Sequence, residues 1–316
     1  MRVLRRWFAA YPWIGSFVGA LLVWLAAILF TGGHGAGGMI TAALALAAFT
    51  VVVGVAQMFV IALGPGNVDL SLPANIGLAS AVAMKVMDGS DSRVALGVAA
   101  AVASGTLVGL GSYLLIRLLR IPPIIATLSA SFIIQSVGIS YGRGLQVKPP
   151  EGFADFCIAE IGGAPVVALC ALVFAAIAHG LLTKTIYGRS VLAIGQNPRA
   201  AWLAGIDVER IRLLTYVQCG ALGGLCGALL AGYFRGSSLE IGDEYLLTSI
   251  AVVVIGGTSV AGGKANIPGV WGASLFLVLL LTMLNTFGVS AGLRLVLTGA
   301  VIIGVIVAAG GEARGR

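Results

Sequence analysis

The chain has 316 residues, of which 59% are hydrophobic and 10% are charged, and its mean hydropathy is +1.05. A soluble domain carries about 25% charged residues, so this composition excludes one and indicates an integral membrane protein. The net charge of +7 is explained by basic residues at a membrane surface and requires no nucleic acid partner. The 46 glycines lie within apolar sequence, which is typical of closely packed membrane helices.

Apolar runs without charge recur along the chain, and several are long enough to cross a bilayer as helices. Dividing them at glycines, prolines and charge clusters predicts about ten crossings, some of them short or broken. The predicted spans are 13–31, 39–62, 71–87, 94–116, 121–142, 162–182, 213–234, 246–262, 267–286 and 293–310. We therefore expect an all-α, polytopic transmembrane helical bundle in which residues 1–316 form a single domain.

The basic residues indicate how these spans are oriented, because Lys and Arg are enriched in cytoplasmic loops. With the N-terminus inside, the cytoplasmic segments hold most of them, namely Arg2, Arg5, Arg6, Arg117, Arg120, Lys184, Arg189, Arg199, Arg210, Arg212, Lys264, Arg314 and Arg316. The sequence therefore predicts that both termini are cytoplasmic.

A polar stretch, LGPGNVDLSLP at 63–73, follows directly after a long charge-free run. Its glycines and prolines predict a break between two helices. Asp69 or Ser71 can cap the short helix that follows by accepting its free N–H groups, and the helix dipole favours a carboxylate there. An acid inside a membrane is also a candidate for solute contact or ion coupling. Asn67, Asp69 and Ser71 are therefore candidate residues of a solute pathway or gate.

The span at 121–142 opens with two prolines, which a first helical turn tolerates, and then carries polar side chains. Thr127, Ser131 and Gln135 follow at i, i+4 and i+8, so we expect them to share one helical face. Such a face can line a path for a polyhydroxylated solute. It can equally hydrogen-bond to the carbonyls of its own helix or to a neighbouring helix.

The longest polar stretch predicted to be cytoplasmic is the loop at 184–212. Asn197 and Pro198 are typical of a helix start, with Asn as the N-cap and Pro in the first helical position. Arg199, Ala200 and Ala201 continue as helix formers. Gly205 is typical of a C-terminal stop. We therefore expect a short amphipathic helix across the cytoplasmic face.

The block GGTSVAGGKANIPG at 256–269 superficially resembles a phosphate-binding loop. That motif requires glycine where Thr258 stands and Ser or Thr where Ala265 stands, so a nucleotide site is excluded. The block is better interpreted as a glycine-permitted bend at the cytoplasmic face. Gly256, Gly257 and Thr258 can then serve close helix packing or gating of the pathway.

Several of these motifs, in this order, resemble those of the permease subunits of ribose-type ABC importers, which transport monosaccharides and related solutes. The matching blocks are NVDLSLPA at 67–74, RIPPIIATLSASFI at 120–133, YGRSVLAIGQNPRAAWLAGIDVERIRLLTYV at 187–217 and IAVVVIGGTSVAGGKANIPGVWGASL at 250–275. The chain departs from the family at Asn67 and Pro73, where glycines are usual, and at Arg199, where an acid is common.

The resemblance implies a function and a set of partners. The helix at 197–205 would be the coupling helix that sits in a groove of a separate ATPase subunit. Its implied residues are Asn197, Pro198, Arg199, Ala200, Ala201 and Gly205. ATP and Mg would be bound by that partner, with no cofactor in this chain, and a solute-binding protein would deliver a sugar or similar solute. The permease would pair with itself or a similar chain in the inner membrane of a bacterium.

The main alternative is a secondary transporter driven by an ion gradient, with Asp69 as the proton or sodium site. The long loop with its own helix argues against it, because an ion-coupled carrier does not require one. An enzyme is not expected, because the sequence has no nucleophile elbow, HExxH motif or paired-acid signature. The four cysteines show no metal-binding spacing.

Overall fold

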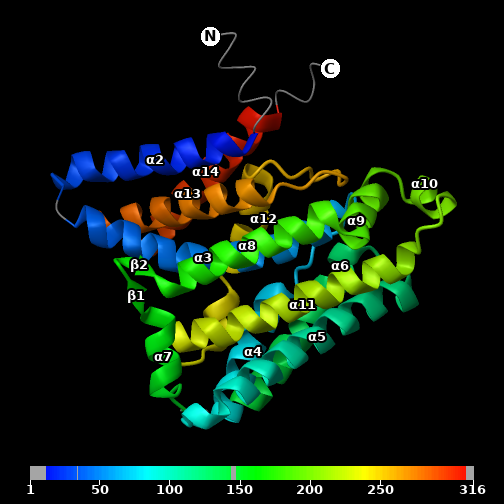
Figure 1. Ribbon diagram of the computed structural model, residues 1–316, viewed down its shortest axis with the longest axis horizontal. Helices are drawn as coiled ribbons and strands as arrows, with labels where there is room; N and C mark the ends of the chain where they lie inside the picture. The colour runs from blue at the N-terminus through cyan, green and yellow to red at the C-terminus, as the bar shows by residue number, and fades with distance from the viewer. Residues whose placement is uncertain (1–11, 34, 144–146, 311–316) are drawn as a thin grey trace.

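The computed structural model describes residues 12–33, 35–143 and 147–310 and is almost entirely helical (Figure 1). The first half of the chain contains α2 (Pro12–Thr31), α3 (Ala36–Ala62), α4 (Leu72–Met87), η1 (Asp91–Arg93), α5 (Val94–Leu119), α6 (Pro123–Gly142) and α7 (Glu151–Ile158). The second half contains α8 (Val166–Lys184), α9 (Ile186–Gln196), α10 (Pro198–Leu203), α11 (Val208–Tyr233), η2 (Leu239–Gly242), α12 (Tyr245–Ile255), α13 (Ile267–Thr286) and α14 (Ala291–Gly310). A two-residue hairpin, β1 (Glu160–Ile161) and β2 (Ala164–Pro165), precedes α8.

A helix is present at each of the ten predicted spans, and seven helices in the described part of the chain are long and apolar enough to cross a membrane. The all-α, polytopic prediction is therefore confirmed. The predicted boundaries are wrong by four or more residues at three places. α8 begins later, at Val166, because the hairpin occupies 160–165, and α11 begins earlier, at Val208. α12 ends at Ile255 rather than at 262, because the next two residues are glycines and Gly257 adopts a φ of 85°.

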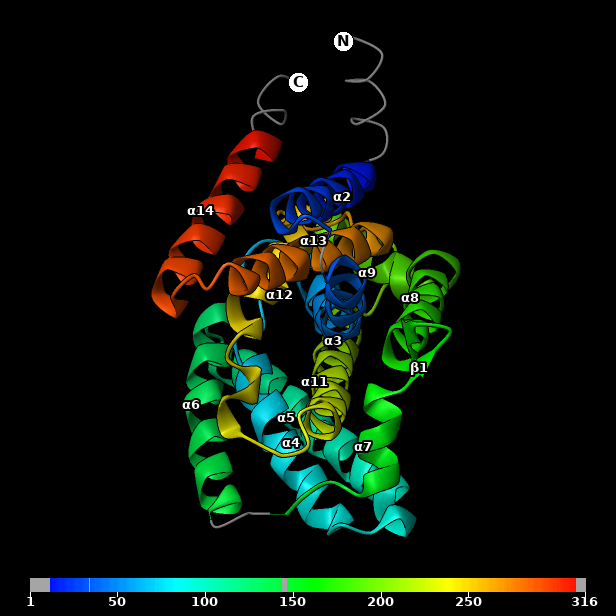
Figure 2. The ribbon, with the colours of Figure 1, turned by 90° about the vertical axis from the view of Figure 1, so that its left-hand side faces the viewer.

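The helix at the centre of the bundle is α3, which the other long helices surround (Figure 2). In the most apolar 18-residue window of this helix, 89% of the residues are buried. An apolar helix in a bilayer can be covered by lipid or by protein. The 27 residues of α3 contain no charged side chain, which suits a central position but does not by itself decide it, because α2 is also uncharged and few of its residues are buried.

Glycines bring α5 and α11 into backbone contact. A Cβ atom added to Gly105 would lie 2.2 Å from the carbonyl oxygen of Gly220, and one added to Gly109 would lie 2.2 Å from that of Tyr216. Close packing of this kind is how small residues hold helices together in a bilayer, where burial of apolar surface drives association weakly. The contact also brings Tyr113 and Arg117, near the end of α5, to Glu209 at the start of α11.

Two helices stop short inside the bundle. α4 has 16 residues and follows an irregular segment at 63–71, and α12 has 11 residues and precedes an irregular segment at 256–266. We call these the first and the second irregular segment. α10 lies at one end of the bundle, and α7 and the hairpin lie at the other (Figure 1). Five basic residues behind the predicted orientation, Arg2, Arg5, Arg6, Arg314 and Arg316, lie outside the described residues.

Candidate functional site

The first irregular segment is held by side chains from three neighbouring helices. Tyr216 of α11 donates a hydrogen bond to Asn67 at 3.3 Å. The hydroxyl of Thr127 of α6 accepts from the N–H of Leu70 at 3.0 Å and lies 3.1 Å from the carbonyl oxygen of Val68. In a membrane these backbone groups have no water to bond to, so the side chains supply the partners that a helix would have given.

Asp69 is only 3% exposed and bonds to its own segment. Its Oδ1 atom accepts from the backbone N–H of Ser71 at 2.9 Å and from the hydroxyl of Ser71 at 2.5 Å. The Ser71 hydroxyl also lies 3.2 Å from that of Ser112 on α5. Ser71 occupies the N-cap position of α4, but its side chain accepts no helix N–H, so the predicted serine cap is wrong. The carboxylate fixes the turn that leads into α4.

The polar face predicted on α6 is divided. Thr127 and Ser131 are buried, and Ser131 donates to the carbonyl oxygen of Leu128 in its own helix at 2.7 Å. Gln135 is exposed, so the three side chains, which the spacing places on one helical face, differ in burial. Eight residues turn an α-helix by about 80° beyond two full turns, which carries Gln135 to the edge of the buried face.

The glycine block after α12 is a tightly packed turn. A Cβ atom added to Gly269, in the first turn of α13, would lie 1.8 Å from the carbonyl oxygen of Gly256. Gly257 adopts a positive φ, and the hydroxyl of Thr258, which is 4% exposed, accepts from the N–H of Asn266 at 3.2 Å. The three predicted residues therefore lie together where α12 crosses the start of α13.

The predicted cytoplasmic loop forms two helices, α9 and α10, and its last residues belong to α11. Asn197 caps α10 as expected, because its Oδ1 atom accepts from the N–H groups of Arg199 and Ala200 at 3.0 Å each. Pro198 occupies the first turn, and Gly205 ends the element with a φ of 85°.

The outer surface of α10 is apolar, which the sequence analysis did not single out. Ala201 is 4% exposed and faces the protein core, whereas Trp202 and Leu203 are 62% and 70% exposed. A hollow of about 550 Å³ adjoins them, with Arg199 and Asp207 in its wall. The signal that could have found this surface is a Trp-Leu pair in an otherwise polar stretch.

Backbone contacts join α9 to both irregular segments. A Cβ atom added to Gly195 would lie 1.9 Å from the carbonyl oxygen of Ala62 and 2.3 Å from the nitrogen of Gly263. One added to Gly262 would lie 2.4 Å from the Cα atom of Gly64. The N–H of Gly263 donates to the carbonyl oxygen of Ala62 at 3.0 Å. We call this contact of Gly64, Gly195, Gly262 and Gly263 the glycine junction.

The glycine junction connects α10 to the bundle along a short path. Gln196 follows Gly195 and donates to the carbonyl oxygen of Gly263 at 3.3 Å. The next residue is Asn197, which caps α10. α10 is therefore connected through α9 to the end of α3 and to the second irregular segment. This arrangement suits mechanical transmission.

Among the described residues, no group of three His, Cys, Asp or Glu side chains could hold a metal ion.

The family model described as "Branched-chain amino acid transport system / permease component" matches residues 37–306. The chain belongs to this permease family. The permease is 34% identical to the ribose import permease protein RbsC of Bacillus subtilis (strain 168) over 242 residues. These residues cover 75% of this chain and 74% of the relative. It is 33% identical over 245 residues to RbsC of Escherichia coli (strain K12), covering 75% of each chain.

A third relative is the autoinducer 2 import system permease protein LsrD of Escherichia coli (strain K12). The permease is 30% identical to it over 249 residues, which cover 77% of this chain and 75% of the relative. No solved structure matches the chain. The family resemblance predicted from the sequence motifs is confirmed, and the permease is a multi-pass protein of the bacterial inner membrane.

Proposed function

We propose that this permease is the membrane-spanning subunit of an ABC importer and forms the pathway for a sugar or similar small polar solute. The observation that carries the proposal is the family match over 37–306, together with relatives named for import of ribose and autoinducer 2. A binding protein would deliver the solute. ATP and Mg would be bound by a separate ATPase subunit, so this chain would hold no cofactor and would not act as an enzyme.

The ATPase subunit is proposed to dock on the loop at 184–212. The exposed side chains of Trp202 and Leu203 support this assignment, since large apolar side chains on a short exposed helix are typical anchors of a protein interface. Asn197, Pro198 and Gly205 would fix the shape of α10, and Arg199 and Ala200 would lie at the contact. Closure of two ATPase subunits would then move α10 as a rigid element.

A homodimer, or a pair with a similar permease, would place the pathway between two copies. About ten crossings, an even number, would leave both termini in the cytoplasm on the side of α10. Asn67, Asp69, Ser71 and Thr127 would hold the first irregular segment as part of the gate, and Ser131 would lie beside them on α6. Gln135 would face the pathway, and Gly256, Gly257 and Thr258 would form the turn that bounds it.

The alternative, an ion-driven transporter that uses Asp69, is not favoured by any observation. The Oδ1 atom of Asp69 is already engaged with Ser71, and the relatives are named as permeases of import systems.

The experiment reconstitutes the permease in liposomes with the ATPase and binding protein encoded beside it, and measures uptake of D-ribose, D-xylose, D-galactose and D-glucose. We expect uptake of at least one sugar that requires ATP and both partners. Uptake by the permease alone, driven by a proton or sodium gradient, would overturn the proposal in favour of the ion-coupled alternative.

A further inference from the structure

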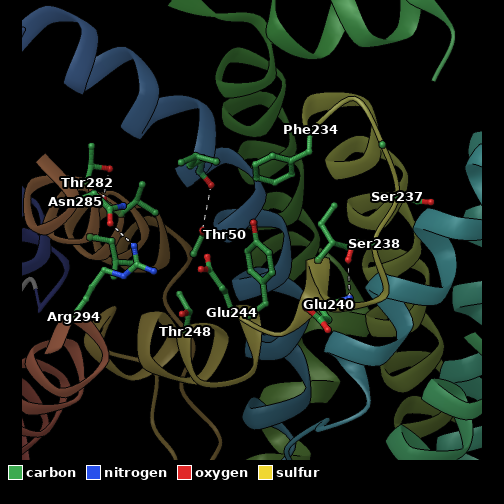
Figure 3. A pocket seen from close by; sticks show the side chains of 16 residues that line it. Thr50, Phe234, Ser237, Ser238, Glu240, Glu244, Thr248, Thr282, Asn285 and Arg294 are labelled. Carbon is green, nitrogen blue, oxygen red and sulfur yellow. Dashed lines mark hydrogen bonds between the residues drawn. The ribbon is translucent and has the colours of Figure 1, made fainter. Parts of the chain in front are cut away.

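A cavity of about 580 Å³, lined by both apolar and polar side chains, lies between α3, η2, α12, α13 and α14 (Figure 3). Its polar wall includes Thr50, Glu240, Glu244, Thr248, Asn285 and Arg294. A volume of this size suits a small-molecule ligand, because such pockets measure about 300–1,000 Å³. None of these residues belongs to the irregular segments or to α10.

The cavity lies toward the end of the bundle that faces away from α10. The chain enters α11 just after α10 and leaves it at Tyr233, and η2, which contributes Glu240, follows that far end. Asn285 lies near the end of α13, whose first turn packs on Gly256. If α10 meets the ATPase, this is the side on which a binding protein releases its solute.

Of the charged side chains that line the cavity, only that of Arg294 has a hydrogen-bond partner among the described residues. Arg294 donates to the side-chain oxygen of Asn285. Within the described residues, the carboxylates of Glu240 and Glu244 have no ion-pair or hydrogen-bond partner. Figure 3 shows Glu244 turned toward Thr50, with Arg294 on another wall. Both residues are exposed, so the cavity offers two solvent-accessible acceptor groups, and an ionised carboxylate accepts stronger hydrogen bonds than a neutral oxygen does.

This set of groups selects a class of ligand. Hydroxyl groups can donate to the two carboxylates and accept from Arg294. An anionic solute would instead meet two negative charges against one positive charge. The crowding of acids here is evident at Asp243, whose pKa is raised by burial and by the neighbouring charge of Glu240. The exposed ring of Phe234 adds an apolar face against which the C–H groups of a sugar ring can pack.

We propose that this cavity binds a neutral polyhydroxylated solute, with Glu244, Glu240 and Arg294 as its principal hydrogen-bonding groups. The inference rests on the proposed function, and it adds a solute site on the permease itself, separate from the binding protein. The site would receive the released solute before the irregular segments open. It would favour neutral sugars over the corresponding acids.

The first experiment measures occupancy directly, without the binding protein or ATP. Thr248→Cys is introduced together with Cys170→Ala, which removes the exposed native thiol. Cys157, Cys219 and Cys226 are buried, and burial raises the pKa of Cys157 to about 12, so these thiols react slowly. We expect D-ribose or another transported sugar, at twice its dissociation constant, to slow N-ethylmaleimide labelling of Cys at position 248 about threefold. D-gluconate should not slow it.

The second experiment uses Glu244→Gln in the reconstituted importer, with Glu151→Gln as a control because Glu151 is exposed at the start of α7, outside the cavity. Loss of a hydrogen bond to a charged group should reduce sugar uptake at subsaturating solute about tenfold or more. Glu151→Gln should transport normally.

The outcomes separate the two proposals. If the parent importer takes up sugar, but that sugar gives no protection at position 248 and Glu244→Gln transports normally, the cavity assignment is overturned and the proposed function stands. Stronger protection by D-gluconate or D-glucosamine than by any neutral sugar would also overturn it. Failure of the parent importer to take up any sugar with ATP and both partners, while sugar still protects position 248, overturns the proposed function alone.

Discussion

Replacing Gly195 by alanine tests whether the glycine junction transmits movement between α10 and the bundle. The added Cβ atom would lie 1.9 Å from the carbonyl oxygen of Ala62, whereas an ordinary contact is at least 3.4 Å. The backbones must therefore separate by about 1.5 Å, the difference between these two distances. The same shift would stretch the 3.0 Å hydrogen bond from Gly263 to Ala62.

The cost can be worked out from these contacts. Overpacking of a close-packed site costs about 1–3 kcal/mol. Weakening the hydrogen bond adds up to about 1 kcal/mol. Alanine recovers up to about 1 kcal/mol because it is a better helix former than glycine inside α9. We therefore expect Gly195→Ala to lower the free energy of unfolding by about 1–3 kcal/mol.

The functional effect should exceed the loss of stability. Sugar uptake per ATP hydrolysed is measured in liposomes, and thermal unfolding is measured in detergent. The control is Gly180→Ala in α8, where an added Cβ atom meets nothing within 4 Å. We expect Gly195→Ala to fold and to bind the ATPase but to transport less solute per ATP. Equal melting and equal coupling in the two variants would refute the role of the junction.

Three further variants test α10, the helix on which the ATPase is proposed to dock, and Asp69. Trp202→Ala should weaken ATPase binding by at least about 2 kcal/mol in pull-down titrations. The control is Leu29→Ala near the end of α2, another exposed apolar residue that lies far from α10, and it should not weaken binding. Asn197→Ala should speed amide hydrogen exchange in α10 and lower the stability of that helix by about 1 kcal/mol. Asn197→Asp should do neither, because Asp is also a good N-cap residue. Equal exchange rates in the two variants would contradict the role of Asn197 as the cap. Asp69→Asn should keep most ATP-driven uptake, because the amide oxygen still accepts from Ser71; complete loss of uptake by a variant that folds normally would contradict this structural role.

Much of the fold could be predicted because a bilayer constrains helix length and excludes charge. Apolar runs with little or no charge therefore located a helix at every predicted span. The lengths of α4 and α12 could be predicted less well. α12 ends at Ile255, where Gly257 adopts a positive φ and Gly256 packs on Gly269 of a separate helix. A local pattern of apolar residues does not contain this information.

In α10, some residue-level predictions from the sequence were right and others could not be made. The cap at Asn197 and the stop at Gly205 are local features, and both were found from the sequence. Tertiary packing decides which face of α10 packs against the rest of the permease. Ala201 is buried, so the substitution Ala201→Asp would destabilise the fold by burying a charge and would not be a clean test of docking. Trp202 is the better probe.

The two irregular segments share a physical requirement that limits how a gate built from them can move. Each exposes backbone groups that a helix would satisfy, and an unsatisfied group in a membrane costs several kcal/mol. Thr127 supplies a partner in the first segment, and Thr258 supplies one in the second. The first segment can therefore change position only together with α6, which carries Thr127, whereas the Thr258 bond lies within the second segment and holds it together as one unit. A push from α9 through Gly195 would move whole packed units, which is the discrete behaviour that a coupled gate requires.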